Sequence, residues 1–225
     1  MFEAVILAGG MGTRLKSVSG DTPKPMVEVA GQPFLYRLMR SLENNGCEHI
    51  VLSLGYRADY IARMIEKDRP VDIPVSFATE SEPLGTGGAI KNAAKLINSD
   101  KFLVLNGDSF SDVSFAKLIE QAKSADLLIS GVKIEDAGRY GTLELTPDYK
   151  VTRLIEKGIS GPGIINSGIY VVSRQDIMAF AQNKFSFEVD YLGQFNGRFR
   201  ASVNDGYFID IGIPEDYYRA CEYFA

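Results

Sequence analysis

Hydrophobic residues alternate between two patterns over the first half of the chain. Short runs that are apolar throughout predict strands at 4–8, 49–54, 75–79 and 102–106. Between these runs, apolar positions three and four residues apart predict helices at 34–46, 57–67, 87–97 and 114–124, with Gly46 capping the first. Strands that have no polar face and are separated by helices favour a mainly parallel sheet covered on both sides.

The pattern changes after residue 126. Strand-like segments follow one another with short turns, and helical periodicity returns only at 174–181 and 214–224. The strands expected here cover 126–134, 141–147, 150–158 and 163–173. We therefore predict one α/β domain over 1–225 with a Rossmann-like, mixed and mainly parallel sheet flanked by helices. Its nucleotide-binding half is expected at about 1–125, and a second substrate-binding half at about 126–225.

The bulk composition narrows the class of protein. The chain has 225 residues, 45% of them hydrophobic, and a formal net charge of −5. That hydrophobic content is enough for a full core, while the acidic balance argues against a nucleic-acid partner. No apolar run approaches the roughly 18 residues of a membrane span, and the start, with Glu3 and no basic region, resembles a first strand rather than a signal peptide. We expect no membrane partner.

The two cysteines point to the compartment. Cys47 and Cys221 lie far apart, in no metal-ligand spacing. Two structural thiols in a chain of this length are typical of a reducing environment, so we predict a cytoplasmic protein.

A glycine-rich turn follows the first predicted strand in "AVILAGGMGTRLKSVSGDTPKPM" (4–26). A P-loop would need a Gly-Lys-Ser/Thr sequence that the chain lacks, and a dinucleotide fingerprint would need glycine at Leu15. What remains is an open backbone with a cation at each end, Arg14 and Lys24. We expect a phosphate chain between these cations, in a solvent-accessible cleft. The flanking prolines should keep Lys24 in an extended segment, and no helix is expected directly after the glycines.

Two aspartates follow predicted strands. Asp108 comes after "KFLVLNG" and Asp210 after "GYFI", so both should lie at carboxyl ends of strands, where they can converge. Mg²⁺ prefers one or two carboxylates together with phosphate oxygens and water. Taken singly, each aspartate is equally consistent with an ordinary turn. His49 is the only histidine, so we expect no Ser-His-Asp arrangement and a structural or exposed role for His49.

Several motifs together resemble those of the sugar-1-phosphate nucleotidylyltransferases, the nucleotide-sugar pyrophosphorylases. The resemblance covers nearly the whole chain through "LAGGMGTRL", "PKP", "EPLGTGGAI", "LNGDS", "EKG", "NSGIYV" and "FIDIGIPEDY". Within the family, the motifs are most similar to those of bacterial enzymes that guanylylate heptose 1-phosphates. Gly158 and Ile213 depart from the proline and threonine of many relatives. Since the chain ends soon after its last predicted helix, no left-handed β-helix domain is expected.

The resemblance implies an enzyme that makes an NDP-sugar and pyrophosphate from an NTP and a sugar 1-phosphate, with Mg²⁺ as cofactor. It implies catalytic roles for Arg14 and Lys24 and metal binding by Asp108 and Asp210. The nucleotide-binding residues would be Leu7, Ala8, Gly9, Gly10, Gly12, Thr13, Glu80 and Gly85. The sugar-phosphate side would contain Tyr140, Gly141, Glu156, Lys157 and Asn166. A homo-oligomer such as a dimer stays open.

The choice of base depends on Glu80. Family members that use thymine or uracil tend to have glutamine there, whereas a carboxylate accepts only and suits the N1–H and N2–H₂ donors of guanine. GTP is therefore expected, although Glu82 is an alternative base contact and both residues could be solvated loop acids. The glycines at 85–88 would permit close approach by the flat ring.

Other functions stay open. A mannose 1-phosphate guanylyltransferase, or a uridylyl-, cytidylyl- or thymidylyltransferase, would use the same motifs. A catalytically inactive nucleotide-sugar sensor is the alternative from another class, and the four charged residues Arg14, Lys24, Asp108 and Asp210 favour the enzyme. The expected chemistry needs no histidine, because a sugar phosphate is largely dianionic at neutral pH, with a second pKa of about 6.

Overall fold

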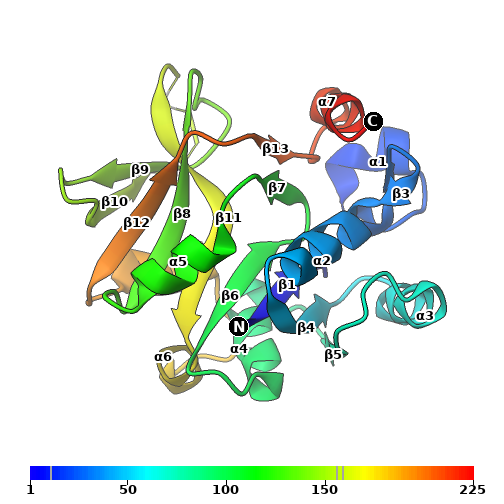
Figure 1. The fold of residues 1–225 in the computed structure, drawn as a ribbon, viewed down its shortest axis with the longest axis horizontal. Coiled ribbons are helices and arrows are strands. Elements are labelled where there is room, and N and C mark those ends of the chain that lie inside the picture. Colours follow the sequence, from blue (N-terminus) through cyan, green and yellow to red (C-terminus); the bar gives the residue numbers. More distant parts are fainter. Residues whose placement is uncertain (11, 156, 159) are drawn as a thin grey trace.

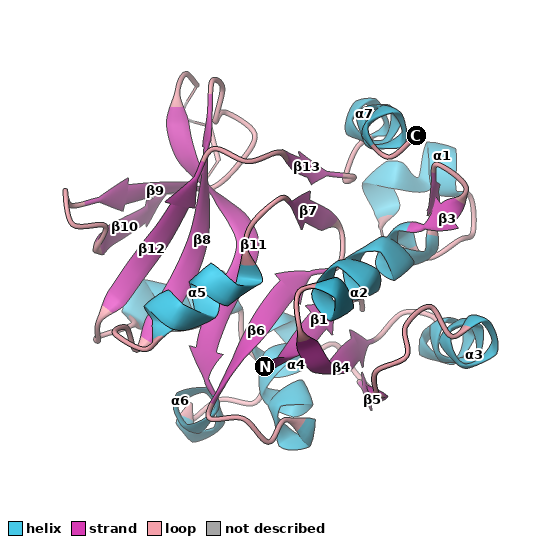
Figure 2. Cartoon of the chain, viewed as in Figure 1, coloured by secondary structure: helices cyan, strands magenta, loops and turns pink. Residues whose placement is uncertain are grey.

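The computed structural model describes residues 1–225 except 11, 156 and 159. Its centre is a twisted sheet with seven strands in one row, and β11 is the one antiparallel strand in that row over the described residues. The row runs β12 (Phe199–Asn204), β8 (Leu127–Ile134), β11 (Gly163–Ser173), β6 (Lys101–Asn106), β1 (Phe2–Leu7), β4 (Cys47–Leu54) and β5 (Val75–Thr79). Two further strands, β9 (Thr142–Leu145) and β10 (Val151–Ile155), extend from β11 (Figure 2).

The central strands are buried on both faces. In β1, Val5 pairs with Val51 of β4 and with Val104 of β6, and all three side chains are fully buried. This explains why these segments are apolar throughout rather than alternating. The predicted α/β class, with a mixed and mainly parallel sheet flanked by helices, is confirmed.

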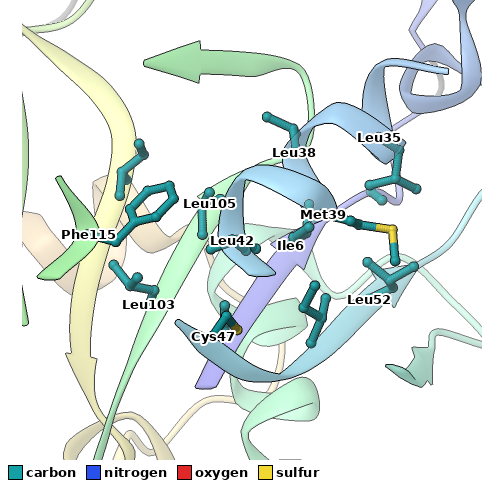
Figure 3. Close-up of a cluster of buried hydrophobic side chains, with 14 of the residues drawn as sticks. Ile6, Leu35, Leu38, Met39, Leu42, Cys47, Leu52, Leu103, Leu105 and Phe115 are labelled. Carbon is teal, nitrogen blue, oxygen red and sulfur yellow. The ribbon is translucent and has the colours of Figure 1, made fainter. Parts of the chain in front are cut away.

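Helices cover the two faces of the sheet (Figure 1). On one face lie α2 (Phe34–Asn44) and α5 (Phe115–Ala122), and α4 (Gly85–Ala93) and α6 (Arg174–Ala179) lie on the other. Figure 3 shows how α2 inserts Leu38, Met39 and Leu42 above Ile6 and Leu105 of the sheet. The helices α3 (Ala58–Asp68) and α7 (Pro214–Tyr223) flank the edge and the upper side of this core.

Short elements complete the upper side of the sheet. The strands β7 (Ser109–Ser111) and β13 (Phe208–Asp210) form an antiparallel pair, and so do β2 (Glu28–Val29) and β3 (Gln32–Pro33). The remaining helical turns are η1 (Thr13–Leu15), α1 (Lys16–Ser19), η2 (Lys24–Met26), η3 (Ala94–Leu96), η4 (Phe187–Tyr191) and η5 (Leu192–Gln194). None of the helices in the described residues is long and apolar enough to cross a bilayer.

The sequence patterns predicted the positions of the long helices and strands well, but two predictions about local backbone structure are wrong. Helical structure does begin directly after the glycines, with η1 at Thr13 followed by α1. Lys24 starts the turn η2 and is not in an extended segment, because only Pro23 before it has extended backbone angles. Proline is well tolerated in a first helical turn, so Pro25 fits η2. Gly46 does follow the end of α2, with a φ of 86° and its N–H bonded to the Glu43 carbonyl.

Candidate active site

A cavity opens where the carboxyl ends of β1 and β6 meet. The Gly107 N–H donates to the Leu7 carbonyl at 2.9 Å, which joins the loops that follow the two strands. The cavity has a volume of about 360 Å³, within the range typical of small-molecule sites. The carboxyl end of parallel strands is also where doubly wound folds bind their ligands.

Many of the predicted nucleotide residues line this cavity. The structure brings together Leu7, Gly9, Gly10, Glu80, Gly85 and Asp108 there, and Lys24 joins them from η2. Ala8 is buried and donates its N–H to the Ser53 carbonyl at 2.9 Å, so it fixes the strand end instead of facing the cavity. Gly12 and Arg14 are not among the described lining residues. The backbone of Thr13 starts η1.

Lys24 lies between the two predicted metal ligands. Its Nζ is 2.6 Å from Asp108 Oδ2 and 3.6 Å from Asp210 Oδ1. Burial and the neighbouring Asp108 carboxylate raise the pKa of Asp210, against the opposing charge of Lys24. The cluster therefore holds two carboxylates against one ammonium group, an excess of negative charge that favours a further cation.

The convergence of the two aspartates follows from the small β7–β13 pair. Asp210 ends β13 and lies opposite Ser109, the residue after Asp108. The Ile211 N–H donates to the Asp108 carbonyl at 2.9 Å, and the Gly212 N–H donates to Asp210 Oδ1 at 2.7 Å. These hydrogen bonds hold both carboxylates at one point above the sheet.

The donor set fits Mg²⁺. Asp108 and Asp210 supply two carboxylates that are partly exposed, at 39% and 31% of their side-chain area. Among the described residues, no cluster of three or more acidic, histidine or cysteine side chains forms a complete metal cage. Two carboxylates with the other positions left for phosphate oxygens and water is the arrangement that this ion prefers.

The two predicted cations differ in exposure. Arg14 is exposed, in line with the expected accessible cleft, but the Lys24 side chain is only 10% exposed. Lys24 does line the cavity, as expected for a residue of the cleft, and its low exposure reflects its contacts with the two carboxylates. A Cβ at Gly12 would lie 2.6 Å from the Lys24 Cβ. Glycine is therefore needed at this position, because any side chain would collide with Lys24. A Cβ at Gly10 would meet nothing within 4 Å, which leaves that backbone open to the cavity.

The second glycine segment has another role than the one predicted. A Cβ at Gly87 would lie 2.2 Å from the Phe185 ring, and one at Gly88 would lie 2.3 Å from the Asn183 carbonyl oxygen. These glycines let α4 pack tightly against the chain before η4, so they do not leave room for a base. Gly85 does line the cavity, beside Glu80, whose Oε2 accepts the Leu84 N–H at 3.0 Å. The other oxygen of Glu80 stays available to a ligand.

The predicted sugar-side residues form a second group next to the aspartates. Tyr140 is half-buried, and its pKa is raised by burial, by Asp216 and by Asp210. Lys157 is exposed, and its charge acts on Asp210. The Gly141 carbonyl accepts the Asn166 N–H at 2.9 Å, which ties the two predicted residues together. Glu156 lies outside the described residues.

Sequence reasoning missed a third carboxylate in the cavity, beside Glu80 and Asp108. Glu188, on η4, accepts from the Thr86 hydroxyl at 2.9 Å and faces the Tyr170 hydroxyl at 3.5 Å. That hydroxyl is 2.7 Å from Asn166 Nδ2, so a chain of polar groups links α4 to β11. The π-helical turn η4 has no periodic pattern by which the sequence could have revealed it. Asn106, which also lines the cavity, belonged to the recognised "LNGDS" motif.

His49 takes part in a hydrogen-bonded line at the opposite ends of the strands. Its Nδ1 donates to Glu3 Oε1 at 2.8 Å, and its Nε2 lies 2.9 Å from the Ser76 hydroxyl. The acid in this line is a glutamate, not the aspartate of a Ser-His-Asp arrangement. None of the three is among the described residues that line the cavity. The position inside β4 agrees with the structural role expected for His49.

Comparison with known proteins agrees with this geometry. The family model described as "Nucleotidyl transferase" matches residues 3–224. The chain is 39% identical over 220 residues to the D-glycero-alpha-D-manno-heptose 1-phosphate guanylyltransferase of Campylobacter jejuni, covering 96% of this chain and 97% of that protein. The crystal structure of HddC from Yersinia pseudotuberculosis superposes with a TM-score of 0.95 at 56% identity, and its complex with GMP-PN with 0.94, each covering 100% of both chains. The chain belongs to the nucleotidyl transferase family.

Proposed function

We propose that this protein transfers the guanylyl group of GTP to D-glycero-α-D-manno-heptose 1-phosphate, giving GDP-heptose and pyrophosphate. The observation that carries the proposal is the Lys24–Asp108–Asp210 cluster beside a cavity lined by Gly9 and Gly10. Similarity over the whole chain to a heptose 1-phosphate guanylyltransferase, and to a protein solved with GMP-PN, supports the choice of both substrates.

In the proposed reaction a phosphate oxygen of the sugar 1-phosphate attacks the α-phosphorus of GTP. The new P–O bond forms as the bond to the β-phosphate breaks, and its electrons leave with pyrophosphate. The attacking oxygen needs no general base, because it is already ionised at neutral pH. The protein has to align two anions and stabilise the charge that develops at the α-phosphate.

The residues divide this work between the two halves of the domain. The open backbone at Gly9 and Gly10 holds the triphosphate, and the cations Arg14 and Lys24 offset its charge. The half at about 126–225 brings Lys157 to the sugar phosphate, with Tyr140 and Asn166 beside the hydroxyl groups. Asp108 and Asp210 would hold Mg²⁺, which when bound supplies positive charge to the phosphate oxygens.

The proposed substrates indicate the cellular compartment in which the reaction takes place. GTP and sugar 1-phosphates are cytoplasmic metabolites, and both cysteines are free thiols in the structure. We therefore place the reaction in the cytoplasm, as a supply step for a heptose-containing surface polysaccharide such as a capsule or lipopolysaccharide.

The direct test is a pyrophosphate-release assay with each NTP and a panel of sugar 1-phosphates. GTP with the heptose 1-phosphate should give the highest kcat/KM. A higher value with mannose 1-phosphate, or with UTP, would replace the assigned substrate. Tight GTP binding without turnover on any sugar would indicate the nucleotide sensor. Adding EDTA should abolish turnover, and full activity in EDTA would exclude Mg²⁺ as the cofactor.

The base assignment has its own test in Glu80→Gln. A glutamine can still accept the Leu84 N–H, so the turn should survive. It meets guanine's two donors with one acceptor and one donor, and a mismatched buried polar group typically costs about 1–3 kcal/mol. The donor and acceptor of glutamine also suit the O4 and N3–H of a pyrimidine, so UTP and dTTP should improve while GTP weakens. The ratio of kcat/KM for GTP to that for UTP or dTTP should therefore fall at least about tenfold. Glu82→Gln, at an exposed position, tests the alternative base contact, because a fall in the ratio there and not in Glu80→Gln would assign the base reading to Glu82. An unchanged ratio for Glu80→Gln would show that Glu80 does not read the base.

A further inference from the structure

Asp216 is a buried charged residue outside the reaction scheme above. It lies in the first turn of α7 and is 1% exposed. Its Oδ1 accepts from Arg219 NH1 at 3.0 Å, and its Oδ2 accepts from Arg139 NH2. Buried carboxylates are stable only when paired in this way. Arg219 is on the same helix, whereas Arg139 belongs to the loop between β8 and β9, so the second ion pair joins distant parts of the chain.

The loop joined by Arg139 is the one that carries Tyr140 and Gly141. The guanidinium of Arg139 lies 5.6 Å from the centre of the Tyr140 ring. That ring packs edge-on against Phe208, with ring centres 5.3 Å apart. Phe208 starts β13, the strand that ends at Asp210. Two contacts therefore fasten this loop to the Asp210 segment, one ionic through α7 and one aromatic through β13.

Arg139 and Asp216 differ in solvent exposure, and this difference determines what happens when their ion pair is broken. The Arg139 side chain is 51% exposed, while the Asp216 carboxyl is almost wholly buried. Once released, the guanidinium can be solvated where it stands, so its loss from Asp216 need not unfold the domain. The loop keeps its backbone hydrogen bonds, such as the one from the Asn166 N–H to the Gly141 carbonyl, but loses its ionic tie to α7. A loop loosened in this way must lose the extra conformational freedom again when substrate binds, and that loss lowers affinity.

We infer that Asp216 is a positioning residue, which holds the Tyr140–Gly141 loop against the Asp210 segment through Arg139 and thereby sets the affinity for the sugar 1-phosphate. The inference rests on the proposed function, in which this loop contacts the sugar phosphate. Asp216 is not among the described residues that line the nucleotide cavity. Its effect should therefore fall on one substrate and spare the other.

The test is Asp216→Asn, which keeps the shape of the side chain and removes its charge. Steady-state kinetics with both substrates varied should show KM for the sugar 1-phosphate raised about ten- to a hundredfold, the range expected when a positioning element is loosened. KM for GTP should stay unchanged. Arg219→Gln is the matched control, because it removes the other ion pair of Asp216 without touching the loop, and it should leave both KM values unchanged.

Variants of Arg139 show whether this residue positions the loop or contacts the substrate directly. Arg139→Gln should match Asp216→Asn, the double variant should be no worse than either single variant, and Arg139→Lys should recover part of the loss. An additive double variant, or a larger loss in Arg139→Gln than in Asp216→Asn, would show that Arg139 acts on the substrate directly and would overturn the inference. An equal rise in both KM values would overturn it as well, since that is the mark of a general structural defect.

Hydrogen exchange at residues 137–141 tests the anchoring independently of turnover. Asp216→Asn should speed exchange of these amides, and Arg219→Gln should not. If the parent protein turns over no sugar 1-phosphate, the proposed function fails while this measurement still decides the anchoring. If turnover is normal but exchange and KM are unaffected in Asp216→Asn, the inference fails while the proposed function stands.

Discussion

Two polar clusters with acidic side chains, one around Glu3 and one around Asp108 and Asp210, lie at opposite ends of the central strands β1 and β6, and they differ in how completely the acids are neutralised. At the amino ends, Glu3 accepts from His49 with one oxygen and from the N–H groups of Asn98 and Ser99 with the other, at 2.8, 2.8 and 2.6 Å. At the carboxyl ends, Asp108 and Asp210 share the single ammonium of Lys24.

The pKa shifts of the two clusters have opposite signs. Burial opposes ionisation of Glu3, but hydrogen bonds from His49, Ser99 and Asn98 outweigh it, so the pKa of Glu3 is lowered. For Asp210, burial and the neighbouring Asp108 carboxylate dominate, so its pKa is raised. A closed set of hydrogen bonds stabilises a fold, whereas leftover negative charge destabilises it and favours an incoming cation. The candidate site is therefore distinguished by carboxylates that are incompletely neutralised, and not merely by the presence of acidic residues.

The largest expected effect comes from removing the cation of the carboxyl-end cluster. Lys24→Ala should lower kcat by about 10²–10³, because it deletes one pre-organised charge from the transferring phosphate, a loss of about 2.7–4 kcal/mol. Steady-state turnover at saturating GTP and sugar 1-phosphate measures this. Ser76→Ala, in the other cluster, should leave kcat unchanged. Near-parental activity of Lys24→Ala would remove this residue from the catalytic set.

The amino-end cluster should affect stability alone. Glu3→Gln leaves some of the donors around Glu3 unmatched, which should lower the free energy of unfolding by about 1–3 kcal/mol with kcat unchanged. Urea unfolding of the parent and the variant gives this value, with Glu48→Gln at an exposed position of the neighbouring strand β4 as control. A loss of activity without a loss of stability would contradict the structural role.

The difference in stability between the parent and Glu3→Gln should also depend on pH. Since the pKa of Glu3 is lowered in the folded protein, its ionised form contributes stability above the unfolded value of about 4.3, and that contribution is lost as the pH falls through the folded value. The stability difference between the parent and Glu3→Gln should therefore be constant near neutrality and shrink in acid. A difference that persists unchanged in acid would rule out this linkage.

The smallest predicted change in stability has the opposite sign to that of Glu3→Gln. The pKa of Asp210 is raised, so its ionised form destabilises the folded protein above that pKa, and the cost disappears as the pH falls. Asp210→Asn keeps the Gly212 hydrogen bond and should raise the free energy of unfolding at neutral pH by less than about 1 kcal/mol, while turnover is lost. Both proteins should be unfolded without metal. If Asp210→Asn is then less stable than the parent, Lys24 fully neutralises the Asp108–Asp210 pair.

The sequence determined more of the structure of residues 1–125 than of residues 126–225, for a physical reason. The strands β1, β4, β5 and β6 and the helices between them were visible because long buried elements impose a period on their apolar residues. The edge strand β12 was missed although Phe199, Ala201 and Val203 alternate along it and pack on the core. The three-residue β7 was also missed, because so few side chains cannot show a period.

Within the site, the sequence by itself pointed to the residues that the structure brings together: the glycines after β1, the cation Lys24 and the two aspartates. The tertiary structure decided how they meet. Only the pairing of β7 with β13 places Asp210 beside Asp108, and only then is Lys24 enclosed between them. The tertiary structure also decided that Gly87 and Gly88 serve helix packing. Local sequence records a residue's own backbone preferences, whereas the neighbour that a side chain or a missing Cβ will meet is set by segments far along the chain.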